Sequence, residues 1–315
     1  MSSGLSARRP RLSRRWPADA SLYDRVAMET SSVVIRRYST SFGLASRLLA
    51  QPVRQHVENI YGLVRLADEV VDGVAASADL DAERIAGCLD ALEQETAAAL
   101  SCGYSTNLVV HAFCLTAREV GIQDDIIAPF FRSMRADLSA TRHTQESFDD
   151  YVYGSAEVVG LMCLQAFLHG ERVSDAKRAV LVDGARHLGA AFQKINFLRD
   201  LAADFGTLGR SYFPGIDVTT FTEAEKSRIV ADIENDLRIA RASLPGLPAT
   251  SRRAVALAQG LFEELTERLR ETPAAVLAET RIRVPNPVKA RIAAGAALGR
   301  LPRRRPDPRE GDTTE

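Results

Sequence analysis

Four side chains able to bind an ion fall on one face of a predicted helix between residues 61 and 73. They are Tyr61, Arg65, Asp68 and Asp72. An α-helix turns by about 100° per residue, so the four share a sector roughly 60° wide, and apolar side chains fill the other directions. In a poorly solvated site, two carboxylates about 6 Å apart repel by roughly 3 kcal/mol at an effective dielectric near 20. We therefore expect a cation beside them. The alternative is a solvated acidic flank on which Arg65 pairs with Asp68, where like charges cost only about 0.2 to 0.5 kcal/mol.

A second predicted helix carries a matching set of side chains. Gln193, Asn196, Asp200 and Asp204 share a sector about 80° wide, again among apolar neighbours. Two such helices facing each other across a cavity would offer four carboxylates to Mg²⁺, which prefers carboxylate ligands together with substrate phosphates. The ligand implied is a diphosphate. Magnesium and guanidinium groups stabilise a departing diphosphate, and apolar walls would protect the allylic carbocation left behind from water.

The same acidic spacing also occurs where we expect no site. Asp232 and Asp236 lie four residues apart, on the flank of a stripe formed by Ile229, Ile233 and Leu237. This pattern is typical of an ordinary amphipathic surface helix. Spacing alone is therefore a weak signal, unless apolar surroundings and a matching second helix accompany it.

Helical periodicity predicts the elements that hold these two acidic faces. Besides the helices around Asp68 and Asp200, helical segments are predicted at residues 20–37, 80–120 (two helices), 124–138, 252–270 and 287–298. No alternating strand pattern of any length appears, so we predict an all-α protein. Two glycines in one apolar segment, Gly154 and Gly160, would permit close helix approach or a break.

The composition narrows the classes of function. The chain has 315 residues, is 46% hydrophobic and carries a net charge of −1, which suits one large helical domain or two smaller ones. Residues 1–18 hold five arginines and no acid, and residues 299–315 hold five arginines and four acids. The region between them is therefore acidic, and we expect no nucleic-acid interface there.

The ends of the chain and its cysteines bear on localisation. No apolar segment follows the basic N-terminus, so we predict no secretory signal, and the longest apolar run, 158–168, is too short to span a membrane. Four widely spaced cysteines fit a reduced, cytoplasmic protein. We expect flexible tails at 1–18 and 299–315 around a body from 19 to 298. Peripheral binding to anionic membrane through the basic tails is the alternative to solvated tails.

The two acidic helices and their surroundings resemble the squalene and phytoene synthases, a family of head-to-head prenyl transferases. The matching residues occur in the order expected for that family: Ser39, Thr40, Ser41 and Phe42; Tyr61, Arg65, Asp68 and Asp72; Tyr151, Tyr153, Gly154 and Gly160; Gln193, Asn196, Arg199, Asp200 and Asp204; Gly209, Arg210, Tyr212 and Pro214. The resemblance spans about residues 21 to 290. Within the family the sequence looks closest to bacterial phytoene synthases.

The resemblance implies a single isoprenoid-synthase-type all-α domain with a central active-site cavity. It implies Mg²⁺, or Mn²⁺, as the cofactor, no nicotinamide, and prenyl diphosphates as substrates. Magnesium diphosphate would be held by Asp68, Asp72, Asn196, Asp200 and Asp204. Phosphate oxygens would be contacted by Arg65, Arg199, Arg210, Ser39 and Ser41. The reacting centre would be lined by Tyr61, Tyr153 and Gln193.

The activity that the resemblance implies is that of a phytoene synthase in carotenoid biosynthesis. Two geranylgeranyl diphosphates would be joined head to head through a cyclopropylcarbinyl diphosphate, with release of diphosphate. A squalene or dehydrosqualene synthase acting on farnesyl diphosphate is one alternative, although the absence of a GxGxxG nicotinamide fingerprint disfavours the reductive squalene reaction. A non-catalytic assembly subunit with the same fold is another.

Three positions depart from the family pattern. Ala203 stands where many members have a glutamate, which puts the metal arrangement in doubt and keeps the non-catalytic alternative open. Glu157 replaces a usual glycine and adds a charge either near the cavity or on its outside. Leu261 stands where a tyrosine often lines the pocket.

Overall fold

The described part of the chain is helical throughout. The computed structural model describes residues 20–72, 78, 80–139, 142–208 and 211–299. Within these residues the only β-type pairing is an isolated bridge between Arg142 and Ser211, which confirms the all-α prediction. The expected tails lie almost entirely in residues 1–19 and 300–315, outside the described part.

The helices follow one another along the chain with short connections. Their order is α1 (Leu22–Tyr38), α2 (Ser41–Ser46), α3 (Val53–Asp72), α5 (Ala82–Cys102), α6 (Leu108–Val120), α7 (Asp124–Ala136), α8 (Gln145–Val152), a π-helical turn η1 (Tyr153–Glu157), α9 (Val158–Leu168), α10 (Asp175–Leu208), η2 (Val218–Thr220), α11 (Glu223–Ser243), η3 (Leu244–Gly246), α12 (Ala249–Glu271), α13 (Ala274–Leu277) and α14 (Asn286–Ala297). The predicted helices at 20–37, 80–120, 124–138, 252–270 and 287–298 are confirmed.

Local sequence signals explain where several helices begin and end. Ser21 and Asp24 form a capping box at the start of α1, and Thr222 and Glu225 form another at the start of α11. Each such box satisfies two backbone N–H groups that the first helical turn leaves unpaired. At the end of α5, Gly103 adopts φ 83°, a left-handed conformation that glycine reaches without a steric penalty.

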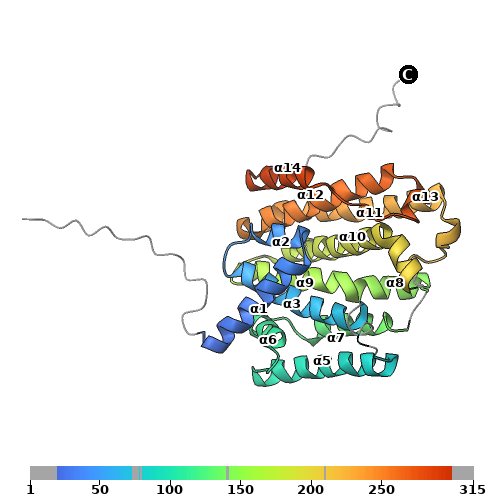
Figure 1. The fold of residues 1–315 in the computed structure, drawn as a ribbon. Coiled ribbons are helices and arrows are strands. Elements are labelled where there is room, and N and C mark those ends of the chain that lie inside the picture. The colour runs from blue at the N-terminus through green and yellow to red at the C-terminus, as the bar shows by residue number, and fades with distance from the viewer. Residues whose placement is uncertain (1–19, 73–77, 79, 140–141, 209–210, 300–315) are drawn as a thin grey trace, which may run out of the picture.

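The long helices stack roughly side by side, from α5 through α3, α9 and α10 to α12 and α14 (Figure 1). Helix α9 packs against both α3 and α10, so it lies between the two helices that carry the acidic faces. One apolar core surrounds α3, α6, α7 and α9 and includes Phe113, Phe130 and Phe131. Another surrounds α10, α11 and α12 and includes Ile195 and Leu198. Each acidic helix is therefore fixed by a core of its own.

Glycines allow close approach of backbone around α9 and η1. A Cβ atom on Gly154 would lie 2.3 Å from the carbonyl oxygen of Pro129, and one on Gly160 would lie 2.5 Å from that of Ala185. Gly189 on α10 meets Ala156 in the same way, at 2.5 Å. Only glycine fits at such distances, so the prediction of close approach at Gly154 and Gly160 is confirmed.

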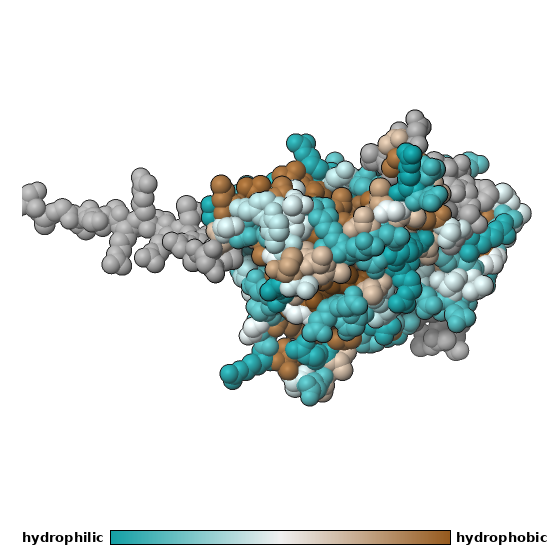
Figure 2. Space-filling model, turned by 90° about the horizontal axis from the view of Figure 1, so that it is seen from below, coloured by the Kyte–Doolittle hydropathy of each residue, from teal (hydrophilic) through white to brown (hydrophobic). Residues whose placement is uncertain are grey.

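The apolar segment around α9 is longer than the sequence suggested. Helices α8, η1 and α9 form one continuous run, 145–168, that is long and apolar enough to cross a membrane by length and composition. Half of its most apolar window is buried inside the protein, and the core helix of a soluble protein passes the same test. Elsewhere, hydrophobic side chains reach the surface in patches among hydrophilic ones, as the face in Figure 2 shows.

Candidate active site

The acidic face of α3 is a half-buried cluster of charged side chains in which Arg65 lies beside Asp68. Arg65 forms an ion pair with Glu69 one turn later, and its Nη1 atom lies 3.8 Å from Oδ2 of Asp68. The guanidinium group also lies over the ring of Tyr38, 4.6 Å from its centroid. The Nε atom of Arg65 is buried and has no hydrogen-bond partner among the described residues. This side chain therefore retains one donor for another acceptor.

Tyr61 joins this cluster to the start of α2. It shares a hydrogen bond with Ser39, whose Oγ atom accepts from the backbone N–H of Phe42 at 3.0 Å. Burial raises the pKa of Tyr61, against the opposite effect of the Arg65 guanidinium. The phenol therefore keeps its proton at neutral pH and can donate a hydrogen bond. Ser41, the first residue of α2, is partly buried.

The acidic face of α10 carries its own arginine pair. Asp200 accepts from Nε of Arg199 at 3.0 Å and from Nη2 of Arg281 at 3.4 Å, and Nε of Arg281 lies 2.8 Å from its Oδ1 atom as an ion pair. Asn196 and Gln193, one and two turns before Asp200, are also partly buried. The sequence did not single out Arg281, because it lies in the segment between α13 and α14, 81 residues from Asp200. The sequence signal that could have pointed to Arg281 is Arg283, two residues later in the same short basic stretch.

Tyr153 lies at the first position of the π-helical turn, between the two halves of the site. Its ring packs against the core that holds α3, and its other neighbour is Arg186 of α10, whose guanidinium carbon lies 5.3 Å from the ring centroid. Arg186 in turn donates to Glu157 at 2.7 Å. π-helical turns inside α-helices frequently occur at functional sites, and this one projects a tyrosine between two helices that carry acids.

Three predicted site residues cannot be placed in the same detail. Asp72 and Asp204 lie within α3 and α10, but their side chains fall outside the described part, and Arg210 falls outside it altogether. Among the side chains that the structure does describe, no group of three or more His, Cys, Asp or Glu could hold a metal ion. The described carboxylate and amide oxygens at the acidic faces are those of Asp68, Gln193, Asn196 and Asp200. Carboxylate and amide oxygens are the ligand type that suits Mg²⁺, so the donor set fits that ion.

Comparisons with known proteins match this arrangement to one family. The family model of squalene/phytoene synthase matches residues 35–287. A 15-cis-phytoene synthase of Enterobacter agglomerans is 28% identical over 253 residues, covering 72% of this chain and 80% of that protein. The chain belongs to the squalene/phytoene synthase family. A second relative, the 15-cis-phytoene synthase of Paracoccus sp. (strain N81106 / MBIC 01143), is 29% identical over 188 residues, 59% of either protein.

Solved structures show the same fold. A crystal structure of a dehydrosqualene synthase in complex with a ligand has a TM-score of 0.74 to this chain at 20% identity, and the match covers 88% of this chain and 97% of that one. The all-α arrangement described above is therefore that of known squalene/phytoene synthase folds.

The three departures from the family pattern have different surroundings. Ala203 is exposed on α10. Glu157 is 15% exposed and forms an ion pair with Arg186 beside Tyr153. Leu261 is 2% exposed and packs in a core with Ala45 of α2. Hydrophobic packing therefore explains a leucine at position 261.

The acidic pair on α11 corrects one prediction. Asp232 is exposed, as an amphipathic surface helix requires, but Asp236 is only 4% exposed. It accepts from Nζ of Lys194 at 2.9 Å and lies 2.7 Å from Nδ1 of His187. The sequence could not show this, because both partners lie on α10, more than 40 residues away. Asp236 therefore belongs to a buried ion pair. The interpretation of Asp232 and Asp236 as surface residues was wrong for Asp236.

Proposed function

We propose that this member of the squalene/phytoene synthase family is a phytoene synthase of carotenoid biosynthesis. It would join two geranylgeranyl diphosphates head to head through a cyclopropylcarbinyl diphosphate and release diphosphate. The observation that carries the proposal is the pair of half-buried acid and arginine clusters on α3 and α10, separated by α9. Relatives named 15-cis-phytoene synthase support the choice of product.

Each cluster in this proposal holds an aspartate that is already paired with arginine. Arg65 lies beside Asp68, and both Arg199 and Arg281 bind Asp200. Such pairs keep cationic groups at a site that must receive an anion, and guanidinium groups bind phosphate oxygens in a fixed fork. A diphosphate would therefore arrive where donors are already oriented. The unpaired Nε of Arg65 is one such donor.

We propose the following roles for the side chains. Magnesium, or manganese, would neutralise the diphosphate and assist its departure. The residues that would hold it are Asp68, Asp72, Asn196, Asp200 and Asp204. Phosphate oxygens would be bound by Ser39, Ser41, Arg65, Arg199 and Arg210, and also by Arg281. Tyr61, Tyr153 and Gln193 would line the reacting carbons.

The position of Tyr153 suits a reaction that passes through carbocations. Its ring belongs to an apolar core on one side and lies close to Arg186 on the other. The negative face of an aromatic ring attracts a cation without offering it a nucleophile. Tyr61, which keeps its phenolic proton, can donate to a leaving oxygen while the surrounding apolar side chains exclude water.

Product analysis tests this function. Purified protein is incubated with magnesium and either geranylgeranyl or farnesyl diphosphate, and the hydrocarbons are extracted and identified. We expect a C40 hydrocarbon from the C20 substrate. A C30 product formed only from farnesyl diphosphate would identify a squalene or dehydrosqualene synthase instead, and no hydrocarbon from either substrate would favour a non-catalytic subunit.

We also propose that the protein binds peripherally to an anionic membrane on the cytoplasmic side, where its substrates and product would partition. The support is an exposed apolar stripe on α1, next to the basic residues 1–18. Leu22, Val26 and Val33 are 70%, 41% and 46% exposed and fall within a sector of about 40° on the helix. Arg36 and Arg37 are exposed beside them. Basic amphipathic helices of this kind lie in the plane of a membrane surface.

A further inference from the structure

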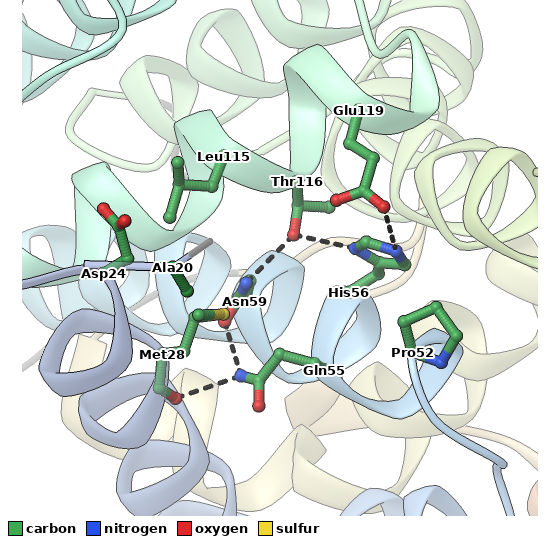
Figure 3. Close-up of a pocket in the computed structure, with 10 residues that line it drawn as sticks. All are labelled: Ala20, Asp24, Met28, Pro52, Gln55, His56, Asn59, Leu115, Thr116 and Glu119. Atoms are coloured by element: carbon green, nitrogen blue, oxygen red, sulfur yellow. Dashed lines mark hydrogen bonds and ion pairs between the residues drawn. The ribbon is translucent and has the colours of Figure 1, made fainter. Parts of the chain in front are cut away.

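Buried polar side chains also cluster outside the candidate active site, and one such cluster surrounds a cavity of about 400 Å³. It lies between α1, the first two turns of α3 and α6, as Figure 3 shows. Its members bind one another: Gln55 donates to Asn59 at 2.8 Å, and Asn59 donates to Thr116 at 2.9 Å. His56 in its wall precedes Asp68 by twelve residues, or about 18 Å along α3. This cluster therefore joins helices at a distance from Asp68.

Another cluster of buried polar side chains is centred on Asp137, which directly follows α7 and is 5% exposed. Its Oδ2 atom accepts from the hydroxyl of Tyr151 at 2.7 Å, and its Oδ1 atom accepts from that of Tyr212 at 3.2 Å. An ionised carboxylate can only accept, so both phenols direct their protons toward it. A negative charge is unfavourable both at the C-terminal end of a helix and out of water. The aspartate is therefore stabilised by contacts from elsewhere in the chain, which include these two hydroxyl groups.

The rings of the two tyrosines pack on the helix that carries the second acidic face. Tyr212 lies flat on Phe197 of α10, with the ring centroids 3.9 Å apart and an angle of 9° between the planes. The ring of Tyr151 lies 5.9 Å from that of Phe197 and 5.5 Å from that of Tyr212. Phe197 precedes Asp200 by three residues, which is less than one helical turn. Asp137 therefore holds two rings that contact α10 beside its acidic face.

Both tyrosines also lie close in the chain to residues that the proposed function uses. Tyr151 precedes Tyr153 by two residues, and Tyr212 follows Arg210 by two residues. Two residues span at most about 7 Å, so the position of Tyr212 limits the reach of Arg210. Asp137 is thereby connected to Tyr153 and to Arg210 through short stretches of chain.

We propose that Asp137 is a positioning residue of the active site. Its carboxylate acts through Tyr151 and Tyr212, which hold Phe197 and the acidic face of α10 in the geometry that binds magnesium diphosphate. Without this carboxylate the two phenols lose a shared acceptor, and their rings are free to shift on Phe197. The inference rests on the proposed function in one respect: it requires a diphosphate at the acidic face of α10, whatever the length of the prenyl chain.

Calorimetric titration of the full-length protein with inorganic diphosphate, in the presence of magnesium, tests the proposal. Tyr212→Phe removes only the hydroxyl and keeps the ring on Phe197, so this variant should fold. We expect its affinity for magnesium diphosphate to fall by about tenfold, within the limit set by a hydrogen bond to a charged group. Asp137→Asn keeps the size of the side chain and should weaken binding at least as much. With geranylgeranyl diphosphate as substrate, both variants should raise KM more than they lower kcat, since the lost interaction serves binding.

Thr96→Val on α5 is the matched control, because it also removes one buried hydroxyl group. Thr96 is 1% exposed and donates to the carbonyl oxygen of Leu92 at 2.7 Å. A structural loss of this kind lowers the melting temperature, but it should leave the affinity for magnesium diphosphate and the KM unchanged. The double variant of Asp137→Asn and Tyr212→Phe should lose little more affinity than Asp137→Asn alone, because both changes remove the same contact.

Wild-type affinity in either Tyr212→Phe or Asp137→Asn would overturn the proposal. An equal loss in Thr96→Val, additive losses in the double variant, or a wild-type protein that does not bind magnesium diphosphate would also overturn it. Failure of the proposed function gives a different result. A wild-type protein that binds magnesium diphosphate but forms no C40 hydrocarbon would contradict phytoene synthesis, while the titrations would still decide the role of Asp137.

Discussion

Asp68 and Asp200 occupy equivalent places in two clusters, each a half-buried carboxylate held next to arginine. If both hold magnesium diphosphate, replacing either by asparagine removes a charge that the departing diphosphate requires. We predict that Asp68→Asn and Asp200→Asn each lower turnover by about 10²-fold or more, the range seen when one stabilising group is lost from an active site. Thermal unfolding should change little. Rates of phytoene formation and melting curves check both parts.

Asp232→Asn is the matched control for these variants. Asp232 has the same spacing to a second aspartate, but it is exposed and pairs with Lys194 of α10. Its loss should leave turnover intact and change stability by no more than about 0.5 kcal/mol. An equally inactive Asp232→Asn variant would contradict the separation of the acidic faces from α11.

Arg281 is the site residue that only the structure brings forward. Its Nε atom lies 2.8 Å from Asp200, while half of its side chain remains exposed. A guanidinium held in this way can turn from a carboxylate to a phosphate oxygen with little loss of entropy. We predict that Arg281→Met lowers kcat/KM by about tenfold or more, equivalent to about 1.4 kcal/mol of transition-state binding. Arg283→Met, two residues away and exposed, should leave kcat/KM unchanged. If both variants lowered kcat/KM equally, the effect would come from the loss of positive charge and not from the contact between Arg281 and Asp200.

At the scale of elements, the ion pairs that join α10 to α11 at Asp232 and Asp236 depend on Lys194. Burial alone would lower the pKa of Lys194, but its hydrogen bonds to Asp232 and Asp236 outweigh this and raise the pKa above 10.5. Breaking a buried pair by removing one partner leaves the other charge uncompensated. We predict that Lys194→Met lowers the free energy of unfolding by about 3 kcal/mol, measured by chemical denaturation at pH 7.

The pH dependence of this ion pair has a definite sign. The pKa of Lys194 is higher in the folded protein than in the unfolded chain, so its contribution is fully present below the unfolded value of 10.5 and is lost as pH rises through the folded value. The difference in unfolding free energy between wild type and Lys194→Met should therefore stay constant from about pH 7 to 9 and shrink only above about 10.5. A difference that already shrinks at pH 8 would contradict this assignment.

The contact between η1 and α10 provides a test of backbone packing. A Cβ atom on Gly189 would lie 2.5 Å from the carbonyl oxygen of Ala156, and backbone at this distance cannot move aside cheaply. We predict that Gly189→Ala destabilises the protein by about 1 to 3 kcal/mol, the usual cost of overpacking. It should also disturb the neighbouring turn that positions Tyr153, so turnover falls as well.

Gly87→Ala is the control for that substitution. Gly87 is an interior residue of α5, and a Cβ there would meet nothing within 4 Å. Alanine should raise helix stability by about 0.5 to 1 kcal/mol. If both alanine variants shifted the melting temperature in the same direction, helix propensity rather than backbone contact would govern position 189.

These elements also show how far the sequence could predict the fold and the site. Periodicity placed the helices, because each buries one face along its own length, and the two acidic faces stood out because their apolar surroundings are local. The pairing of Asp236 with Lys194 and of Asp200 with Arg281 could not be predicted, since each joins residues 42 or more positions apart. The pairing of Arg186 with Glu157 could not be predicted either, because these residues lie on different helices, 29 positions apart.

At the scale of the whole molecule, charge and apolar surface concentrate near α1. Five arginines in residues 1–18 precede a helix that exposes Leu22, Val26 and Val33. Each basic residue near an anionic membrane contributes about 1 kcal/mol, and buried apolar side chains add to this. We therefore predict that deleting residues 1–18 strongly weakens co-sedimentation with phosphatidylserine vesicles, and that added salt weakens wild-type binding in the same way.

The apolar stripe makes a separate contribution that salt should not remove. Replacing Leu22, Val26 and Val33 by serine should weaken binding to the same vesicles at low and high salt alike, because the lost term is hydrophobic. Val180→Ser with Val276→Ser is the control, since these valines are 56% and 42% exposed elsewhere on the molecule. Unchanged binding after the deletion would reject a role for residues 1–18, and unchanged binding after the three serine substitutions would reject α1 as the membrane-facing helix. If the control variant lost as much vesicle binding as the variant with three serines, exposed apolar side chains anywhere on the surface would contribute equally. That result would contradict an orientation with α1 against the membrane.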